Sequence, residues 1–289
     1  MGAPPFERLG IVGLGLVGGS VALAAKRRWP AIVITVCDPA PVTQEAVAQG
    51  LVSAVVATPG ELAACDLIVI ATPVQTVPAV LAQLTAAGTT ALVTDTGSTK
   101  RVVMQAARTT PLTFVGGHPV AGAETSGLGA ARADLFDGRP WLLVSASPEE
   151  ARDPAVFPGV LEAMLATFVV GLGARPEWTD AVTHDRVMAH VSHAPQVVST
   201  ALMAAAGAAV GPDGVAWSGK GFADMTRLAA SSPDVWQGIL DTNADFIADA
   251  LGAITAKLPT SAEALTDTPV VRALFERARA LKSPTSTDR

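Results

Sequence analysis

The stretch LGIVGLGLVGGSVALAA, residues 9–25, decides the fold of this chain. Leu9–Val12 is typical of a short strand, Leu16–Arg28 has the length of a helix, and a GxGxxG turn formed by Gly13, Gly15 and Gly18 joins them. In such a unit the first glycine allows a tight turn, the second lets the backbone approach a pyrophosphate, and the third lets helix and strand pack closely. The helix N-terminus offers N–H groups and partial positive charge to phosphates. The stretch therefore predicts a dinucleotide-binding unit.

An acid follows this unit at the expected distance. Asp38 closes a second predicted strand, 20 residues after Gly18, where a carboxylate binds the ribose 2′-hydroxyl of a dinucleotide. A carboxylate there repels a 2′-phosphate, so NAD is favoured over NADP. Leu16 and Val17, after the second glycine, are further candidate cofactor contacts. A tight turn that binds no ligand is the alternative, and the acid in register argues against it. A phosphate contact by Arg27 or Arg28 stays open.

Composition and charge exclude several classes of protein. The chain has 289 residues, of which 49% are hydrophobic and 16% charged, so it is not a disordered chain. A net charge of −6 without a long Lys/Arg run argues against nucleic-acid binding. The uncharged run of residues 9–25 is shorter than the roughly 20 residues of a membrane helix, and its clustered glycines fit a strand and turn better. Two cysteines, Cys37 and Cys65, are too few for a disulfide framework, and the N-terminus has no secretory pattern. A reduced, cytoplasmic setting is expected.

The pattern along the chain predicts an α/β Rossmann domain over residues 1–178 and an all-α domain over 179–289. Apolar strands alternate with helices in the first part, which indicates a parallel sheet covered on both faces. The further strands are expected at 32–36, 67–71, 91–94, 114–116, 141–145 and 174–178, and the further helices at 42–49, 76–84, 100–109 and 149–171. The second part predicts helices at 181–207, 221–230, 233–257 and 262–281, and SPTSTDR at the end as a frayed tail.

Polar residues follow two of these strands, where a doubly wound sheet has its ligand crevice. Thr72 and Pro73 are candidates to line the nicotinamide or its ribose, with an ordinary turn as the alternative. In TDTGSTK, residues 94–100, Asp95 and Gly97 are candidate cofactor contacts. Ser98 could cap the next helix. Lys100, a cation in the first turn and thus against the helix dipole, suggests anion binding.

The candidate acid–base residue is His118, in the segment GGHPVAGAE. We expect it on a loop after a strand, where an imidazole that titrates near neutrality can accept a proton from a substrate hydroxyl. A packing or surface role is the alternative. Of the other histidines, His190 and His193 could share a helix face, but no HExxH pattern supports a metal site, and none is expected. For His184 and His190 we expect polar positions on a helix surface or interface.

A last candidate group lies in GFADMTRLA, residues 221–229. Arg227 could pair with Asp224 on the helix surface, or its guanidinium could bind a substrate carboxylate. Trp236, on the next helix, could form a wall of the pocket.

Taken together, GLGLVGGS, ATPVQ, TDTGSTK, GGHPVAGAE, VSHAPQ and GFADMTRLA closely resemble the prephenate/arogenate dehydrogenase family of tyrosine biosynthesis. The resemblance runs from about residue 9 to about residue 255, and the last motifs are far more specific than the glycine turn. It implies an NAD(P)-binding Rossmann domain joined to a helical domain that forms a homodimer. It also implies oxidation of a ring 4-hydroxyl with loss of the ring carboxylate as CO₂, without a metal.

By position, the resemblance assigns roles to individual residues. His118 matches the catalytic histidine that hydrogen-bonds the 4-hydroxyl of the substrate. Ser98 matches the serine that orients this histidine and the hydroxyl. Arg227 matches the arginine that binds a substrate carboxylate, and Glu124 and Asp224 match acids that pair with it.

The chain also departs from the family pattern in the substrate pocket. His193 lies in the segment that reaches the pocket, but Gln196 stands where many prephenate-using members have His, and Ala123 where many have Thr. Prephenate carries a side-chain keto group and arogenate an ammonium. A neutral donor such as the Gln196 amide favours prephenate, whereas Glu124 or Asp224 could reach an ammonium, so arogenate or dual use stays open.

Two other classes remain as alternatives. Another two-domain dehydrogenase, of the β-hydroxyacid or imine reductase type, would usually place a Lys or Asp in the helical half as its acid–base group. A non-catalytic dinucleotide sensor would keep the glycine turn and Asp38 but would not need His118 or Arg227.

Overall fold

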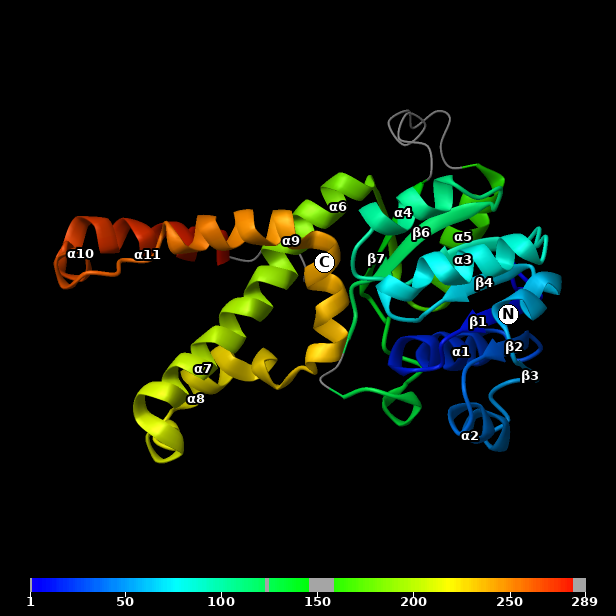
Figure 1. Ribbon diagram of the computed structural model, residues 1–289, viewed down its shortest axis with the longest axis horizontal. Helices are drawn as coiled ribbons and strands as arrows, with labels where there is room; N and C mark the ends of the chain where they lie inside the picture. Colours follow the sequence, from blue (N-terminus) through cyan, green and yellow to red (C-terminus); the bar gives the residue numbers. More distant parts are fainter. Residues whose placement is uncertain (1, 123–124, 146–158, 283–289) are drawn as a thin grey trace.

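The computed structural model describes residues 2–122, 125–145 and 159–282, which form a sheet domain and a helical domain (Figure 1). The strands are β1 (Arg8–Val12), β2 (Val33–Cys37), β3 (Ala54–Val56), β4 (Leu67–Ile70), β5 (Leu92–Asp95), β6 (Phe114–Pro119), β7 (Pro140–Ser145) and β8 (Arg175–Thr179). The helices of this domain are α1 (Leu16–Arg28), α2 (Val42–Ala48), α3 (Val77–Ala86), α4 (Arg101–Arg108) and α5 (Val160–Gly171), with short turns η1 (Pro59–Ala64), η2 (Val74–Thr76) and η3 (Leu128–Ala130).

The sheet has the order β3-β2-β1-β4-β5-β6-β7-β8. It confirms the expected α/β architecture, but β7 runs antiparallel to β6, so the prediction of a parallel sheet was wrong at this pair. In the described part of residues 120–139 the chain returns from β6 to β7 through the short turn η3, and such a return without a crossover helix leaves the strands antiparallel. The sequence also missed β3, which has three residues that are not buried. The part of the predicted helix 149–171 that precedes residue 159 lies outside the described residues, as does the tail from residue 283.

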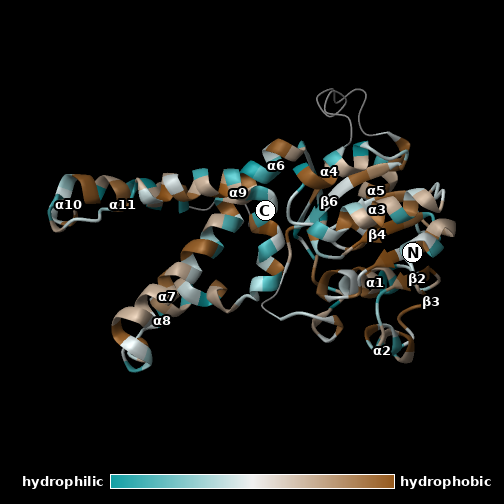
Figure 2. Ribbon diagram, in the orientation of Figure 1, coloured by the Kyte–Doolittle hydropathy of each residue, from teal (hydrophilic) through white to brown (hydrophobic). Residues whose placement is uncertain are grey.

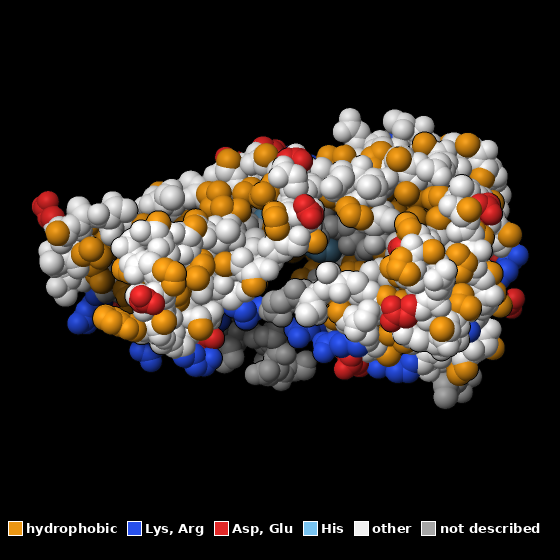
Figure 3. Space-filling model, turned by 60° about the horizontal axis from the view of Figure 1, so that its bottom comes forward, with side chains coloured by type: hydrophobic (Ala, Val, Ile, Leu, Met, Phe, Trp, Pro, Cys, Tyr) orange, Lys and Arg blue, Asp and Glu red, His pale blue; other side chains and the backbone are white. Residues whose placement is uncertain are grey.

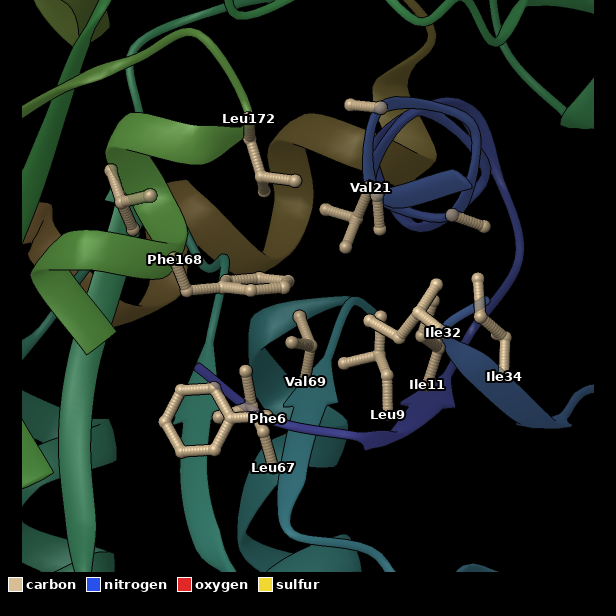
Figure 4. Packing of buried hydrophobic residues seen from close by; sticks show 14 of the residues in the cluster. Phe6, Leu9, Ile11, Val21, Ile32, Ile34, Leu67, Val69, Phe168 and Leu172 are labelled. Atoms are coloured by element: carbon tan, nitrogen blue, oxygen red, sulfur yellow. The ribbon is translucent and has the colours of Figure 1, made fainter. Parts of the chain in front are cut away.

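Helices cover both faces of the sheet. On one face, Phe168 of α5, Leu172 directly after it and Val21 of α1 pack over Leu9 and Val69 of the strands (Figure 4). On the other face, α3 and α4 bury a second cluster against the sheet, which includes Val77, Leu81, Val103, Met104, Ile68 and Val93. A fully buried aliphatic side chain contributes about 1.5–3 kcal/mol, so these two layers hold the strand ends rigidly in place.

The helical domain begins directly after the last strand. Asp180 caps α6 (Ala181–Met188) by accepting hydrogen bonds from the backbone N–H groups of Val182 and Thr183 at 3.0 and 2.9 Å. A π-helical turn η5 (Ala189–His193) leads into α7 (Ala194–Val215). The remaining elements are α8 (Lys220–Thr226), η6 (Arg227–Ala230), α9 (Pro233–Thr255), α10 (Ala262–Thr266) and α11 (Thr268–Lys282).

Much of this domain's apolar surface is exposed. Its own buried cluster is small, comprising Ala189, Ala194, Ile247 and Ala250. Apolar residues lie along the outside of α7, α8 and α11, which project away from the sheet (Figure 2). The continuous helix Ala181–Val215 is long and apolar enough to cross a membrane by length and composition, and only 17% of its most apolar window is buried. Among the described residues, these apolar faces are left uncovered.

The two domains meet closely along α4 and η2. A Cβ atom on Gly238 of α9 would lie 1.9 Å from Oε1 of Gln75 in η2, so the Gln75 side chain lies directly against this glycine. Arg101 of α4 donates from Nη1 to Asp245 Oδ2 of α9 at 2.7 Å and stacks on the Phe246 ring at 4.2 Å. Figure 3 shows a hollow between the two domains, with histidine atoms visible at its base.

Candidate active site

The glycine turn between β1 and α1 has the predicted geometry. Gly13 has a φ of +91°, and a Cβ there would lie 2.7 Å from the Ala71 carbonyl oxygen. A Cβ on Gly18 would lie 1.9 Å from the carbonyl oxygen of Gly13. At Gly15, in contrast, a Cβ would meet no described atom within 4 Å. Gly13 and Gly18 are therefore required by packing within the protein, whereas Gly15 leaves open space above the helix N-terminus, where a pyrophosphate fits.

Asp38 lies directly beside this turn. Its Oδ2 accepts a hydrogen bond from the Leu14 N–H at 2.6 Å, which fixes the carboxylate at the end of β2. Leu16 and Val17 are half-buried in the first turn of α1. Arg27 forms an ion pair with Asp137 at 2.8 Å, at the opposite end of α1 from the glycine turn. The donors, open space and carboxylate of this edge match a dinucleotide.

The loop after β4 also faces this edge of the sheet. Thr72 is half-buried and its hydroxyl oxygen accepts from the Thr76 hydroxyl at 2.8 Å, while Pro73 is exposed.

The loop after β5 contains a buried ion pair that the sequence did not reveal. Lys100 and Asp95 are both fully buried, and the Lys100 ammonium donates to Asp95 Oδ2. The same carboxylate accepts from the backbone N–H groups of Gly97 at 2.8 Å and Gly117 at 3.0 Å. Lys100 is thus paired inside the protein, and the anion-binding interpretation of this residue was wrong. The cofactor contact expected of Asp95 would have to be made by its backbone, since its side chain holds β5, β6 and this loop together.

His118 lies within β6 rather than on a loop after it, so that expectation was also wrong. The residue is 8% exposed, and its ring Nδ1 is 2.9 Å from Nε2 of His184 in α6. His184 is almost fully buried, and its own Nδ1 is 2.8 Å from Asp185 Oδ1. His184 therefore occupies the buried interface between the domains, whereas His190 is exposed and bonded to the Arg186 carbonyl, as expected of a surface histidine.

Asp185 also caps α4 across the domain interface. Its Oδ1 accepts from the Lys100 N–H at 2.6 Å, and its Oδ2 accepts from the Arg101 N–H at 2.9 Å and from Arg101 Nε at 3.2 Å. Lys100 is the N-cap residue, so the capping role considered for Ser98 belongs instead to the carboxylate of Asp185. Ser98 is half-buried in the loop two residues before that cap.

Burial controls the charge state of this cluster. Desolvation lowers the pKa of His118 well below its ordinary value, and the neighbouring His184, Lys100 and His193 act in the same direction. Desolvation also lowers the pKa of His184, against the opposing effect of Asp185. Burial would raise the pKa of Asp185, but hydrogen bonds from His184 and from two backbone N–H groups outweigh it and lower that pKa. The site therefore holds neutral imidazoles against an ionised carboxylate at neutral pH.

His193 faces inward on the π-helical turn and does not share a surface with His190. The Asn243 amide donates to the Asp185 carbonyl oxygen at 2.8 Å and lies 3.2 Å from His193 Nδ1. An amide nitrogen can only donate, so Nδ1 accepts and the ring proton is on Nε2. That buried Nε2 has no hydrogen-bond partner among the described residues, and the ring meets Trp236 edge-on at 6.1 Å. Desolvation lowers the pKa of His193 to about 4, so it is a neutral donor.

The remaining candidates lie around η6. Gln196 Nε2 donates to the Leu228 carbonyl at 2.7 Å and to the Thr200 hydroxyl at 3.3 Å, so both amide hydrogens are engaged within the protein. This ties η6, which begins with the exposed Arg227, to α7. Asp224 pairs with Lys220 at 3.0 Å, one turn earlier. Ala123 and Glu124 lie outside the described residues.

Sequence reasoning missed four residues that organise the site: His184, Asp185, Arg101 and Asn243. No local pattern marked Asn243, because its neighbours Asp241, Thr242 and Asp245 are polar too. It is fully buried and interrupts α9 with a φ of −139°. Asp185 offered one signal, a carboxylate directly beside the imidazole of His184.

Both domains match models of known protein families. Residues 21–170 match the family model for the prephenate dehydrogenase nucleotide-binding domain, and residues 180–273 match that for the prephenate dehydrogenase dimerization domain. The chain is 34% identical to prephenate dehydrogenase of Bacillus subtilis over 83% of its own length and 65% of the relative's. It is 28% identical to prephenate dehydrogenase of Lactococcus lactis, over 96% of this chain and 77% of the relative.

Among solved structures, prephenate dehydrogenase from Aquifex aeolicus, in complex with hydroxyphenyl propionate and NAD⁺, superposes with a TM-score of 0.83 at 26% identity. The match covers 95% of this chain and 96% of the other. Both the sheet domain and the helical domain are therefore shared along nearly the whole length.

Proposed function

This chain belongs to the prephenate dehydrogenase family, and we propose that it converts prephenate to 4-hydroxyphenylpyruvate and CO₂ with NAD as the oxidant. The observation that carries this proposal is His118, a buried imidazole in β6, held by His184 beside the carboxyl edge of a dinucleotide-binding sheet. A base at that position is what oxidation of a ring hydroxyl requires.

The cofactor site suits NAD. When bound, NAD accepts the hydride from the ring carbon that carries the hydroxyl. The open space at Gly15 and the N–H groups of the first turn of α1 suit its pyrophosphate, and Asp38 suits its ribose hydroxyls and disfavours a 2′-phosphate. The other proposed contacts are Gly13, Leu16, Val17, Gly18, Thr72, Pro73, the backbone of Asp95, and Gly97.

His118 supplies the base. Burial keeps its ring neutral, so it can accept the proton of the 4-hydroxyl as the ring carbon is oxidised. Ser98, in the loop beside β6, is proposed to orient the hydroxyl. The ketone that forms accepts the electron pair of the departing carboxylate, and the ring becomes aromatic. The protein's contribution is to align the reacting atoms and to provide one base in a dry site.

The substrate's other groups are assigned to the helical domain. Arg227 is proposed to bind a carboxylate, with Asp224 and Glu124 around it. His193, whose buried Nε2–H has no partner among the described residues, is proposed to donate to the substrate, with Trp236 as the adjacent wall. The contact of Gln196 to the keto group stays a prediction, and it requires the amide to exchange one of its present partners.

We propose that a second copy of the chain covers the exposed apolar faces of α7, α8 and α11. Trp217 is 90% exposed and Phe275 71% exposed, and they belong to the region that matches a dimerization domain. The apolar helix Ala181–Val215 contains His184, Asp185 and His193, whose side chains are buried inside the protein. Such polar residues are unsuited to lipid, so a protein partner fits this helix better than a membrane does. A cytoplasmic homodimer completes the proposal.

The test is formation of NADH, followed by its absorbance with the purified protein. Prephenate and arogenate are offered separately, each with NAD and with NADP. The expected result is turnover of prephenate with NAD. His118→Asn should abolish turnover while NAD still binds, which would exclude a dinucleotide sensor. If NAD binds but neither substrate is turned over, the chain is a sensor or a different dehydrogenase.

A further inference from the structure

We propose that His184 and Asp185 are positioning residues that fix the ring proton of His118 on Nδ1 and thereby leave Nε2 as the base. The assignment of the ring nitrogens stands on the hydrogen-bond geometry and on a neutral His184, whereas its catalytic consequence rests on the proposed function.

The direction of the hydrogen bonds follows from what each atom can do. An ionised carboxylate only accepts, so the 2.8 Å contact between Asp185 Oδ1 and His184 Nδ1 requires a proton on that nitrogen. A neutral His184 then has a bare Nε2, which can only accept. The 2.9 Å contact to His118 therefore requires that His118 Nδ1 donates. The remaining nitrogen of His118, Nε2, keeps its lone pair, and it has no partner among the described residues.

These directions require a neutral His184, since a doubly protonated ring would donate to His118 and reverse the second bond. Two features keep His184 neutral. Asp185 already accepts from the backbone of Lys100 and from the backbone and guanidinium of Arg101, so its charge is compensated without a second proton on His184. Burial and the nearby Lys100 ammonium both lower the pKa of His184, which favours its neutral form.

The other charged and titratable groups around His118 are accounted for. Lys100 precedes α4 and is paired with Asp95 of β5, and His193 lies on the π-helical turn with its Nδ1 accepting from Asn243. Neither competes with His184 for His118 Nδ1. Among the described residues, the hydrogen bonds given for the His118 ring run through His184 to Asp185.

The consequence for the reaction is a balanced proton transfer. The 4-hydroxyl proton moves to His118 Nε2 as the hydride leaves the ring carbon for NAD. The electron pair of the breaking bond to the carboxylate enters the ring, and the proton returns to the resulting phenolic oxygen. His118 is restored, and the net products are 4-hydroxyphenylpyruvate, CO₂ and NADH. While the imidazolium exists, the accepting nitrogen of His184 stabilises it, as an orienting carboxylate does in a catalytic triad.

The first test is nitrogen-15 NMR of the histidine rings, which distinguishes protonated from bare nitrogens. The chain has four histidines, so single substitutions such as His190→Gln assign the signals. At neutral pH we expect His118 and His184 each to carry one proton, both on Nδ1. A bare Nδ1 on His118, or a doubly protonated His184, would overturn the proposal. This readout needs no turnover, so it is independent of whether the proposed function is right.

The second test separates positioning from general structural support. His184→Leu removes the acceptor for His118, whereas His184→Gln offers a carbonyl oxygen in its place. Loss of the group that orients a metal-ligating histidine costs about 10–100-fold, and we expect kcat of the Leu variant to fall by a similar factor. The KM for prephenate and the Kd of NAD should stay near the parent values, and the Gln variant should recover most of the loss. His190→Leu is the control. Equal losses in the Leu and Gln variants, or a loss that falls on KM, would refute the positioning role.

Discussion

Gly15 and Gly18 lie three residues apart in the same turn, yet substituting each by Ala should damage different properties. At Gly18 the new Cβ would lie 1.9 Å from the Gly13 carbonyl oxygen, so the turn has to open. Overpacking of this kind typically costs about 1–3 kcal/mol. Each kcal/mol lowers the melting temperature by about 2–4 °C in a chain of this size. Gly18→Ala should therefore melt several degrees below the parent protein.

Gly15→Ala should leave the fold intact. A Cβ there meets no described atom within 4 Å, and the backbone at φ −77° suits any residue. The lower entropy of the unfolded chain favours Ala by about 0.4–1 kcal/mol, which offsets the poorer capping by Ala at this N-cap position. The methyl group would instead occupy the space proposed for the pyrophosphate. A clash of about 1.4 kcal/mol or more in the complex raises the Kd of NAD at least about tenfold.

Differential scanning calorimetry of the free proteins and calorimetric titration with NAD measure the two effects separately. Gly252→Ala, at an exposed helical site with no described atom within 4 Å of the new Cβ, is the control for a general Gly→Ala effect. If Gly15→Ala lowers the melting temperature as much as Gly18→Ala while NAD binds normally, the division between packing and cofactor space is wrong.

Three further perturbations test other parts of the structure. Asp38→Asn removes the charge that favours NAD. Because hydrogen bonds to charged groups contribute about 1.5–3 kcal/mol, the Kd of NAD should rise about tenfold. Parallel titrations with NADP should show a smaller ratio between the two Kd values than in the parent. The hydrogen bond from Arg101 lowers the pKa of Asp245 to about 2 in the folded protein. The stabilisation from this lowered pKa is fully present above the pKa of Asp245 in the unfolded chain, and it is lost as pH falls towards the folded-state pKa. The melting temperatures of the parent and of Asp245→Asn should therefore converge as pH falls from about 4 to about 2, and a constant gap would contradict the ion pair. Phe275→Glu places a charge on the exposed face of α11 and should shift sedimentation towards the monomer, whereas an unchanged dimer would exclude this face from the interface.

The parts of the fold that could be predicted from the sequence are those that local chemistry fixes. The glycine turn and the strands of the sheet's centre follow from residue types within about ten positions of each other, and the structure confirms them. β3 escaped prediction because it has three residues without a buried face. The antiparallel β7 escaped because strand direction depends on how the chain returns to the sheet, which residues 120–139 do not signal locally.

The sequence by itself determined a dinucleotide-binding α/β domain, an all-α second domain, and His118 as the candidate base, because backbone requirements of glycine and apolar periodicity act over short distances. Only the tertiary structure decided which polar groups are neutral, charged or paired. His118 meets His184 across 66 residues, and Asp185 meets Lys100 across 85. A buried polar group must find its partner wherever folding places one, and that partner sets its protonation state. The charges and proton positions of this site therefore exist only once the two domains have packed together.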